Sequence, residues 1–183
     1  MLVILSGSSG AGKDTIKKEL LKLSSNISTF PAITSREPRG DEVPGEAYIY
    51  VATEEFEDMI KSDELYEYSN HHGNYYGTSK KVINEKLSEG KILVKDIDVN
   101  GTQDLMELLS KDTKFVTIYL KVAKEVLRER LENRGDKDID KRLDRYEYEQ
   151  SKQGMYDYII PNNDMNKTVD IIMTIIESEY KYK

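Results

Sequence analysis

The sequence predicts an α/β protein built on a mainly parallel sheet, and three observations lead to this prediction. Short apolar runs alternate with amphipathic helical patterns along most of the 183 residues. A glycine-rich loop joins the first apolar run directly to the first helical pattern. The length suits one sheet-centred core, so we expect a single domain over residues 1–183. Because parallel strands need helix-length crossovers, we expect helices on both faces of the sheet.

Each expected element follows from the period of its apolar residues. Strands are expected where short apolar runs occur, at residues 2–5, 47–51, 92–98, 115–120 and 158–160, and residues 65–76 are expected to be extended. Helices are expected where apolar residues recur every three or four positions, at residues 14–24, 54–61, 79–88, 101–109, 123–133, a stretch after Gly135, and 167 to about 180.

A tyrosine-rich block from about residue 34 to 78 interrupts the alternation of strands and helices. We expect it to form an inserted lobe. With its flanks, this insert spans about residues 32–88 and separates two core segments, 1–31 and 89–183.

The composition limits the classes of function. The formal net charge of −7 argues against a general nucleic-acid-binding protein, because nucleic acid is itself a polyanion. The sequence contains no cysteine, which excludes disulfides and thiolate metal sites. The apolar runs are too short to cross a bilayer, and the N-terminus leads straight into a strand rather than a signal peptide. We therefore expect a cytoplasmic protein that binds neither nucleic acid nor membrane.

The loop at residues 7–13 reads Gly-Ser-Ser-Gly-Ala-Gly-Lys and stands between a strand and a helix. Its glycines allow successive backbone N–H groups to point at phosphate oxygens, and the helix N-terminus adds partial positive charge. Lys13 adds a full charge near the β- and γ-phosphates. A plain glycine-rich turn would not require the lysine, so we predict a nucleotide-binding P-loop. Its binding residues are Gly7, Ser9, Gly10, Ala11, Gly12, Lys13, Asp14 and Thr15.

Asp14 departs from the usual P-loop pattern. It stands where Ser or Thr normally supplies a hydroxyl to Mg²⁺, and Thr15 comes one position later. Because a carboxylate that faces a triphosphate would be repelled, two interpretations remain open. Asp14 either points away from the phosphates or reaches the metal through water.

The insert contains two arginines, Arg36 and Arg39, three positions apart around Pro38. Guanidinium donors match phosphate oxygens in a bidentate manner, so the pair is suited to hold one phosphate. Tyr48 and Tyr76 are candidates for additional hydroxyl donors. The simpler alternative is a solvated loop with surface arginines.

Acidic residues in and after the insert suggest how a base and a metal are recognised. A carboxylate at Glu67 could accept from the adjacent N1–H and N2–H₂ donors of guanine, which adenine lacks, although taken alone Glu67 is more simply a surface acid. Strand alternation over 92–98 puts Asp96 and Asp98 on one face, at the carboxyl edge where ligands bind in open α/β sheets. Asp96 is thus a candidate for contact with Mg²⁺ through water.

Together these segments resemble guanylate kinases over nearly the whole chain. The resemblance rests on the P-loop, residues 35–39, Gly45, Tyr48, Glu67, residues 74–78, residues 96–98, Arg130, Arg134, Arg142 and Asn162, in the order and spacing of that family. The P-loop alone is generic, whereas the insert with its Tyr75-Tyr76-Gly77 run is specific. One departure lies at Ala32, where the family often has a serine near the base.

The resemblance implies a P-loop three-layer fold with a GMP-binding insert and a short lid at about 130–146. It implies phosphorylation of GMP and dGMP by ATP with Mg²⁺, in a monomer or homodimer. The implied GMP phosphate contacts are Arg36, Arg39, Tyr48 and Tyr76, and the implied guanine contacts are Glu67, Thr78 and Asp98, with Ser35 and Gly77 completing the substrate site. Lys13 and the lid arginines Arg130, Arg134 and Arg142 would act on the transferring phosphates, and Asn162 would lie near the adenine of ATP.

Two other functions remain open at this level. Ribose 1,5-bisphosphate phosphokinases are similar and can carry Gly-Lys-Asp in the loop, as residues 12–14 do here. They phosphorylate a sugar phosphate and would not need Glu67, Thr78 and Asp98. Non-catalytic guanylate-kinase-like modules, which bind phosphopeptides, usually lack an intact nucleotide loop and lid arginines, and this chain has both.

Overall fold

A computed structural model describes residues 1–38, 42–71, 73–109 and 113–181. Its central sheet has five parallel strands in the order β2-β7-β1-β8-β9. These strands are β1 (Leu2–Ser6), β2 (Ile27–Ser28), β7 (Ile92–Asp96), β8 (Phe115–Lys121) and β9 (Tyr158–Pro161). The prediction of a mainly parallel sheet is confirmed.

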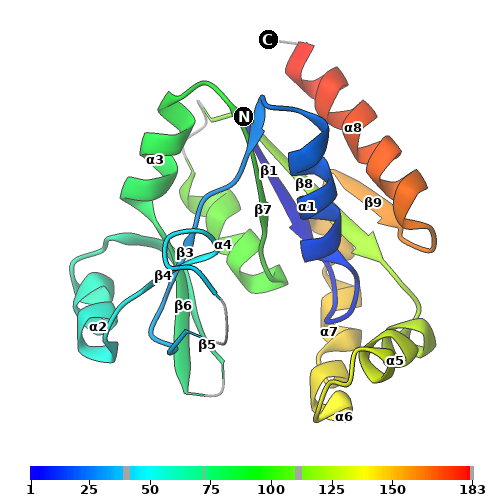
Figure 1. Cartoon of the computed structure of the whole chain (residues 1–183), viewed down its shortest axis with the longest axis horizontal. Helices are drawn as coiled ribbons and strands as arrows, with labels where there is room; N and C mark the ends of the chain where they lie inside the picture. Colours follow the sequence, from blue (N-terminus) through cyan, green and yellow to red (C-terminus); the bar gives the residue numbers. More distant parts are fainter. Residues whose placement is uncertain (39–41, 72, 110–112, 182–183) are drawn as a thin grey trace.

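Helices cover both faces of this sheet (Figure 1). Val3 and Leu5 of β1 belong to a core cluster that includes residues of α1 (Lys13–Leu23) and α8 (Met165–Lys181). Leu2 and Ile4 pack on the opposite face with residues of α3 (Lys80–Ser88) and α4 (Val99–Leu108). Because β1 is central and covered on both sides, its sequence is continuously apolar rather than alternating.

A second sheet has four strands in the order β4-β3-β6-β5. They are β3 (Ala32–Thr34), β4 (Tyr48–Tyr50), β5 (Leu65–His71) and β6 (Asn74–Ser79), and only the β3–β4 pair is parallel. Helix α2 (Thr53–Lys61) packs on this sheet through Phe56, which clusters with Ile33 and Leu65. The stretch predicted to be extended over 65–76 therefore forms part of a hairpin, and β3 was not predicted.

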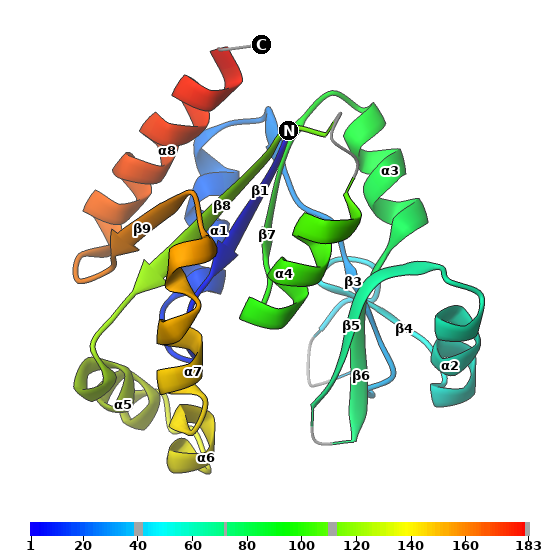
Figure 2. The same ribbon diagram turned by 180° about the vertical axis from the view of Figure 1, so that it is seen from behind.

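The remaining elements follow β8. They are α5 (Lys124–Asn133), α6 (Ile139–Leu143), α7 (Tyr146–Ser151) and the 3₁₀ helix η1 (Gln153–Met155). The single helix expected after Gly135 is thus divided into two short ones. Both views show α5 and α6 and the four-stranded sheet on opposite sides of the lower end of the central sheet (Figures 1 and 2).

The strand expected over residues 92–98 is shorter than predicted, because β7 ends at Asp96. Asp98 is the N-cap of α4, where its Oδ1 accepts a hydrogen bond of 2.8 Å from the backbone N–H of Gly101. The two carboxylates therefore do not alternate along one strand. Capping of a helix start by a short acidic side chain decides the geometry here.

Across the described residues, we find no helix with the length and apolar character needed to span a membrane.

Candidate active site

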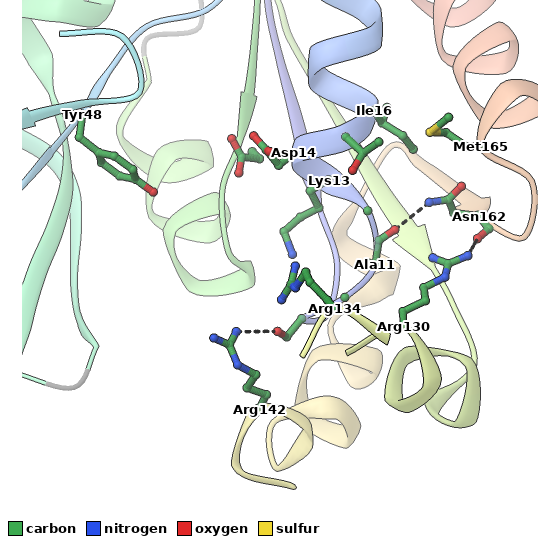
Figure 3. A pocket seen from close by; sticks show the side chains of 15 residues that line it. Ala11, Lys13, Asp14, Ile16, Tyr48, Arg130, Arg134, Arg142, Asn162 and Met165 are labelled. Carbon is green, nitrogen blue, oxygen red and sulfur yellow. Dashed lines mark hydrogen bonds between the residues drawn. The ribbon is translucent and has the colours of Figure 1, made fainter. Parts of the chain in front are cut away.

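The P-loop runs between β1 and α1, and backbone geometry requires glycine in it. Gly12 has a φ of 91°, and a Cβ at this position would lie 2.9 Å from Nδ2 of Asn162. Nδ2 of Asn162, a residue that is 3% exposed, donates to the backbone oxygen of Ala11 at 2.7 Å. Asn162, which directly follows β9, therefore holds the loop in place through this hydrogen bond (Figure 3).

Lys13 is the first residue of α1, and its side chain extends along the loop (Figure 3). Its ammonium group donates to the backbone oxygens of Gly7 and Ser8. Burial lowers the pKa of Lys13, while the charges of Asp96 and Glu149 act in the opposite direction. A partly buried ammonium beside backbone N–H donors is suited to bind an anion, because the anion restores the solvation that burial removes.

Three arginines converge on the loop from the α5–α6 segment. Arg130 donates to the backbone oxygen of Asn162 at 2.7 Å, and Arg134 pairs with Asp136. Arg142 lies on α6, and its NH1 is 3.4 Å from Oγ of Ser9 (Figure 3). All three arginines line one cavity of about 750 Å³ together with Lys13. The four residues predicted to act on phosphates are thus brought together.

Asp14, for which the sequence left two interpretations open, forms ion pairs with two lysines of its own helix. Its Oδ1 is 3.2 Å from Nζ of Lys17, and its Oδ2 is 2.7 Å from Nζ of Lys18. Partial burial alone would raise its pKa, but the hydrogen bond with Lys18 and the charge of Lys17 lower it. Asp14 is therefore an ionised partner of lysines on its own helix.

Lys17 also binds Asp96, at 2.6 Å from Oδ1. Within the described residues, no group of three or more His, Asp or Glu side chains is arranged to hold a metal ion. The side chains do not provide a cage, but they fit a Mg²⁺ held chiefly by substrate phosphates and water, which is the usual mode for this ion. Asp96 and Thr15 line the cavity and are suited to contact its water shell.

A second cavity of about 720 Å³ lies between the insert and the central sheet. It shares Lys13, Asp14, Tyr48, Asp96 and Arg142 with the first cavity, so the two meet at the P-loop. Its remaining walls include five of the residues predicted to bind substrate or base, namely Glu67, Tyr76, Gly77, Thr78 and Asp98.

Glu67 is held in place within this second cavity. Its Oε1 accepts a hydrogen bond of 2.6 Å from Oγ1 of Thr78. Burial raises the pKa of Glu67 to about 7, and the negative charges of Asp98 and Asp104 add to this effect. A Cβ at Gly101 would lie 2.8 Å from Oε2 of Glu67, so the glycine makes room for the carboxylate.

Arg36 is 7% exposed and is engaged within the insert. It donates to Oε1 of Glu42 at 2.9 Å and to the backbone oxygen of Glu37 at 2.7 Å, and its guanidinium carbon lies 5.3 Å from the ring centroid of Tyr48. Among the described residues, Glu42 and Tyr48 line the second cavity whereas Arg36 does not. The structure thus brings Arg36 beside the predicted phosphate site but behind Glu42.

A further predicted substrate residue, Ser35, lies outside the cavity walls. Oγ of Ser35 accepts from the backbone N–H of Tyr75 at 2.9 Å, so this side chain stabilises the second sheet rather than lining the cavity. Arg39 lies outside the described residues.

The residues in the cavity walls that the sequence analysis missed include Lys17, Glu42 and Lys95. Lys95 had a visible signal, because it is a charged residue in the otherwise apolar run Ile92-Leu93-Val94. Glu42 and Lys17 had none, since an acid in a loop and a lysine on an amphipathic helix are ordinary surface residues.

A P-loop that carries four converging cations, and that opens into a second cavity on an inserted sheet, defines a P-loop phosphotransferase with a separate acceptor site. Comparison with known proteins narrows this class. The family model described as guanylate kinase matches residues 1–179. The chain belongs to the guanylate kinase family, and it is a kinase.

The curated relatives match nearly the whole chain. A guanylate kinase of Prochlorococcus marinus subsp. pastoris is 36% identical over 97% of this chain and 97% of its own length. One from Wolbachia pipientis wMel is 37% identical over 98% of this chain and 90% of its own length.

Two solved structures share the fold of this chain. The crystal structure of guanylate kinase from Anaplasma phagocytophilum has a TM-score of 0.76 and is 28% identical, covering 98% of this chain and 85% of that one. A shikimate kinase from Bacteroides thetaiotaomicron, at 17% identity and a TM-score of 0.50 over 97% of this chain and 98% of that one, shares the fold alone.

Proposed function

We propose that the protein transfers the γ-phosphoryl group of ATP to GMP and dGMP, giving ADP and GDP or dGDP. The observation that carries this proposal is the partly buried Glu67–Thr78 pair in a cavity that meets the P-loop. A carboxylate in this position can accept from both N1–H and N2–H₂ of guanine. The relatives named guanylate kinases support the same substrate.

The ATP side of the site uses the P-loop and its surrounding cations. Backbone N–H groups of the loop and the α1 N-terminus bind the phosphates, and Lys13 would exchange its contacts with Gly7 and Ser8 for phosphate oxygens. Arg130, Arg134 and Arg142 neutralise charge that develops on the transferring group. In this proposal, Asn162 positions the loop and also lies near the adenine of ATP.

Magnesium bound with ATP supplies further neutralisation of the phosphate charge. Asp96 and Thr15 are the residues of this chain that would face its water shell. Asp96 is held in position by Lys17, whose ammonium lies 2.6 Å from Oδ1. Asp14 stays paired with Lys17 and Lys18 and makes no direct contact with the metal in this proposal.

The acceptor side divides into a base region and a phosphate region. Glu67 reads the guanine edge, Thr78 orients Glu67, and Asp98 completes the base region from the start of α4. Tyr48 and Tyr76 bind the acceptor phosphate with Arg36, which exchanges Glu42 for the incoming phosphate. Recognition then depends on base and phosphate rather than on the ribose 2′-hydroxyl, which is why we include dGMP.

Arg39 remains a predicted phosphate contact from the sequence. Gly77 shapes the cavity wall in this proposal, and Ser35 acts by fixing the β3–β6 contact. The insert of about residues 32–88 thus serves as the acceptor-binding lobe, and residues 130–146 serve as the lid.

Catalysis then follows from position and charge. The two cavities meet at Lys13, Asp96 and Arg142. There the acceptor phosphate can be positioned for in-line attack on the γ-phosphate. Holding two reactants in such a geometry replaces a bimolecular encounter. A phosphate oxygen is already a competent nucleophile, so no side chain is needed as a general base.

Neither alternative is favoured by the site. A sugar bisphosphate has no base to occupy the Glu67–Thr78 pair, and a phosphopeptide-binding module does not need the phosphate cations that line the first cavity. We therefore retain both only as outcomes of the test.

A coupled ADP-release assay tests the proposal, with ATP and Mg²⁺ and with GMP, dGMP, AMP, UMP or ribose 1,5-bisphosphate as acceptor. We expect turnover with GMP and dGMP only. Turnover with ribose 1,5-bisphosphate alone would replace the proposal by the sugar phosphokinase, and absence of turnover with every acceptor would favour the binding module.

A further inference from the structure

Lys95 contributes a buried charge to the second cavity that the proposed reaction does not use. It is 6% exposed and lies on β7, next to its last residue. Leu93, two positions earlier, packs on the face of the central sheet that carries α3 and α4, whereas Val94 packs on the opposite face. By strand alternation, Lys95 points to the same side as Leu93, toward the insert.

The local contacts of Lys95 do not satisfy its ammonium group. Nζ donates to the backbone oxygen of Phe30 at 2.8 Å and lies 5.2 Å from the centroid of the Phe30 ring. An ammonium has three N–H donors, and within the described residues the Phe30 oxygen is the acceptor for one of them. Burial of a cation with donors to spare is unfavourable, so the cavity offers a place for an additional acceptor.

The surroundings of Lys95 indicate which acceptor fits. Lys95 and Glu67 line the same cavity, and the positive charge of Lys95 acts on the Glu67 carboxylate. Ala32 lines this cavity as well, two residues after Phe30, and its methyl group supplies no polar atom. The described walls therefore present a cationic donor and an anionic acceptor to one ligand.

Guanine has the matching edge. Its O6 is an acceptor, and N1–H and the 2-amino group beside it are donors. A lysine donating to guanine O6 is a common specific contact, whereas adenine carries an amino donor at position 6 that would face the ammonium group. The same cation therefore favours guanine and disfavours adenine.

We propose that Lys95 is a specificity-determining residue of the acceptor site, whose ammonium group donates a hydrogen bond to O6 of guanine while Glu67 accepts from N1–H and the 2-amino group. This inference rests on the proposed function, because it needs a guanine nucleotide in the second cavity.

The test combines a substitution with changes in the ligand. Lys95→Met removes the ammonium and keeps the length and volume of the side chain. Lys91→Met is the matched control, because Lys91 directly precedes β7 and lies outside the walls of both cavities. Dissociation constants are measured by calorimetry for GMP, for IMP, and for 2-aminopurine riboside 5′-monophosphate, which has neither O6 nor N1–H and keeps only the 2-amino donor for Glu67.

We expect Lys95→Met to weaken the binding of GMP and IMP by the same factor, about ten- to a hundredfold, as for loss of a hydrogen bond to a charged group. Binding of the 2-aminopurine nucleotide should change less than about threefold, because it offers no O6 to lose. The KM for ATP and all constants of Lys91→Met should stay at the wild-type level. If Lys95→Met does not fold, Lys95→Gln keeps one N–H donor and should give an intermediate loss with the same dependence on O6.

An equal loss for GMP and the 2-aminopurine nucleotide would overturn the proposal, and so would an unchanged affinity for GMP. Failure of the proposed function has a different signature, because wild-type protein would then bind neither GMP nor IMP. The wild-type measurements thus judge the function, and the comparison between variants judges the role of Lys95.

Discussion

Substitution of Glu67 by glutamine is expected to stabilise the folded protein while it impairs guanine binding. The ordinary pKa of a glutamate carboxyl is 4.5, and burial raises that of Glu67 to about 7. Between these values the unfolded chain is ionised at this position and the folded chain is not, so stability falls as the pH rises from 4.5 through 7. Above pH 7 the folded protein carries the full penalty of a buried charge.

The size of the effect follows from the difference in pKa. At about 1.4 kcal/mol per pH unit, the penalty reaches about 3 kcal/mol at pH 8. Glutamine keeps the volume and can still accept the hydrogen bond from Thr78 that Glu67 accepts at 2.6 Å, but it carries no charge. The repulsion from Asp98 and Asp104 is also removed.

Urea denaturation of both proteins from pH 5 to pH 8.5 measures this difference. Glu67→Gln should match wild type near pH 5 and exceed it by about 1–3 kcal/mol at pH 8. The same variant should raise the KM for GMP much more than that for ATP. A variant that is less stable than wild type at pH 8, or a difference that does not change with pH, would refute the reasoning.

Three further substitutions test other parts of the site. Lys13→Ala should abolish turnover, with an unchanged circular dichroism spectrum, and activity near the wild-type level would disprove the assigned role of the P-loop lysine. Gly101→Ala places a methyl group 2.8 Å from Oε2 of Glu67 and should raise the KM for GMP about tenfold without altering that for ATP; a parallel rise in both would indicate a general loss of structure. Asn162→Ala removes the 2.7 Å hydrogen bond to the backbone of Ala11. Denaturation should show a loss of stability of about 1 kcal/mol, and the KM for ATP should rise. An unchanged KM for ATP would contradict the role of Asn162 in holding the loop.

Much of the fold could be predicted because it depends on local periodicity. The apolar run at residues 2–5 and the glycine loop after it predicted β1, the P-loop and the start of α1, and the structure has all three. The predicted element boundaries were wrong where a local effect, such as helix capping, overrode the spacing of apolar residues. The strand over 92–98 ends at Asp96, because Asp98 caps α4, and two short helices replace one after Gly135.

The site residues also fall into two groups: those that the neighbouring sequence makes recognisable, and those that only the folded structure explains. Lys13 could be proposed from the sequence because its chemistry depends on the residues beside it in the chain. Glu67 taken alone looked like a surface acid. In the folded protein, burial and the charges of Asp98 and Asp104 raise its pKa. Its contacts with Thr78 and Gly101 fix its position. The hairpin of β5 and β6 and the start of α4 provide this environment, and they are brought together by packing.

The sequence by itself determined the class of fold, the phosphate loop and the set of charged residues available for a reaction. The tertiary structure decided which of those charges face a cavity and which face each other. It paired Arg36 with Glu42, and Asp14 with Lys17 and Lys18. It also buried Lys95 beside the acceptor cavity. The physical reason is that the spacing of apolar residues and the effects of glycine and capping residues act over a few positions. Burial and charge pairing instead depend on distances between segments that are remote in the chain.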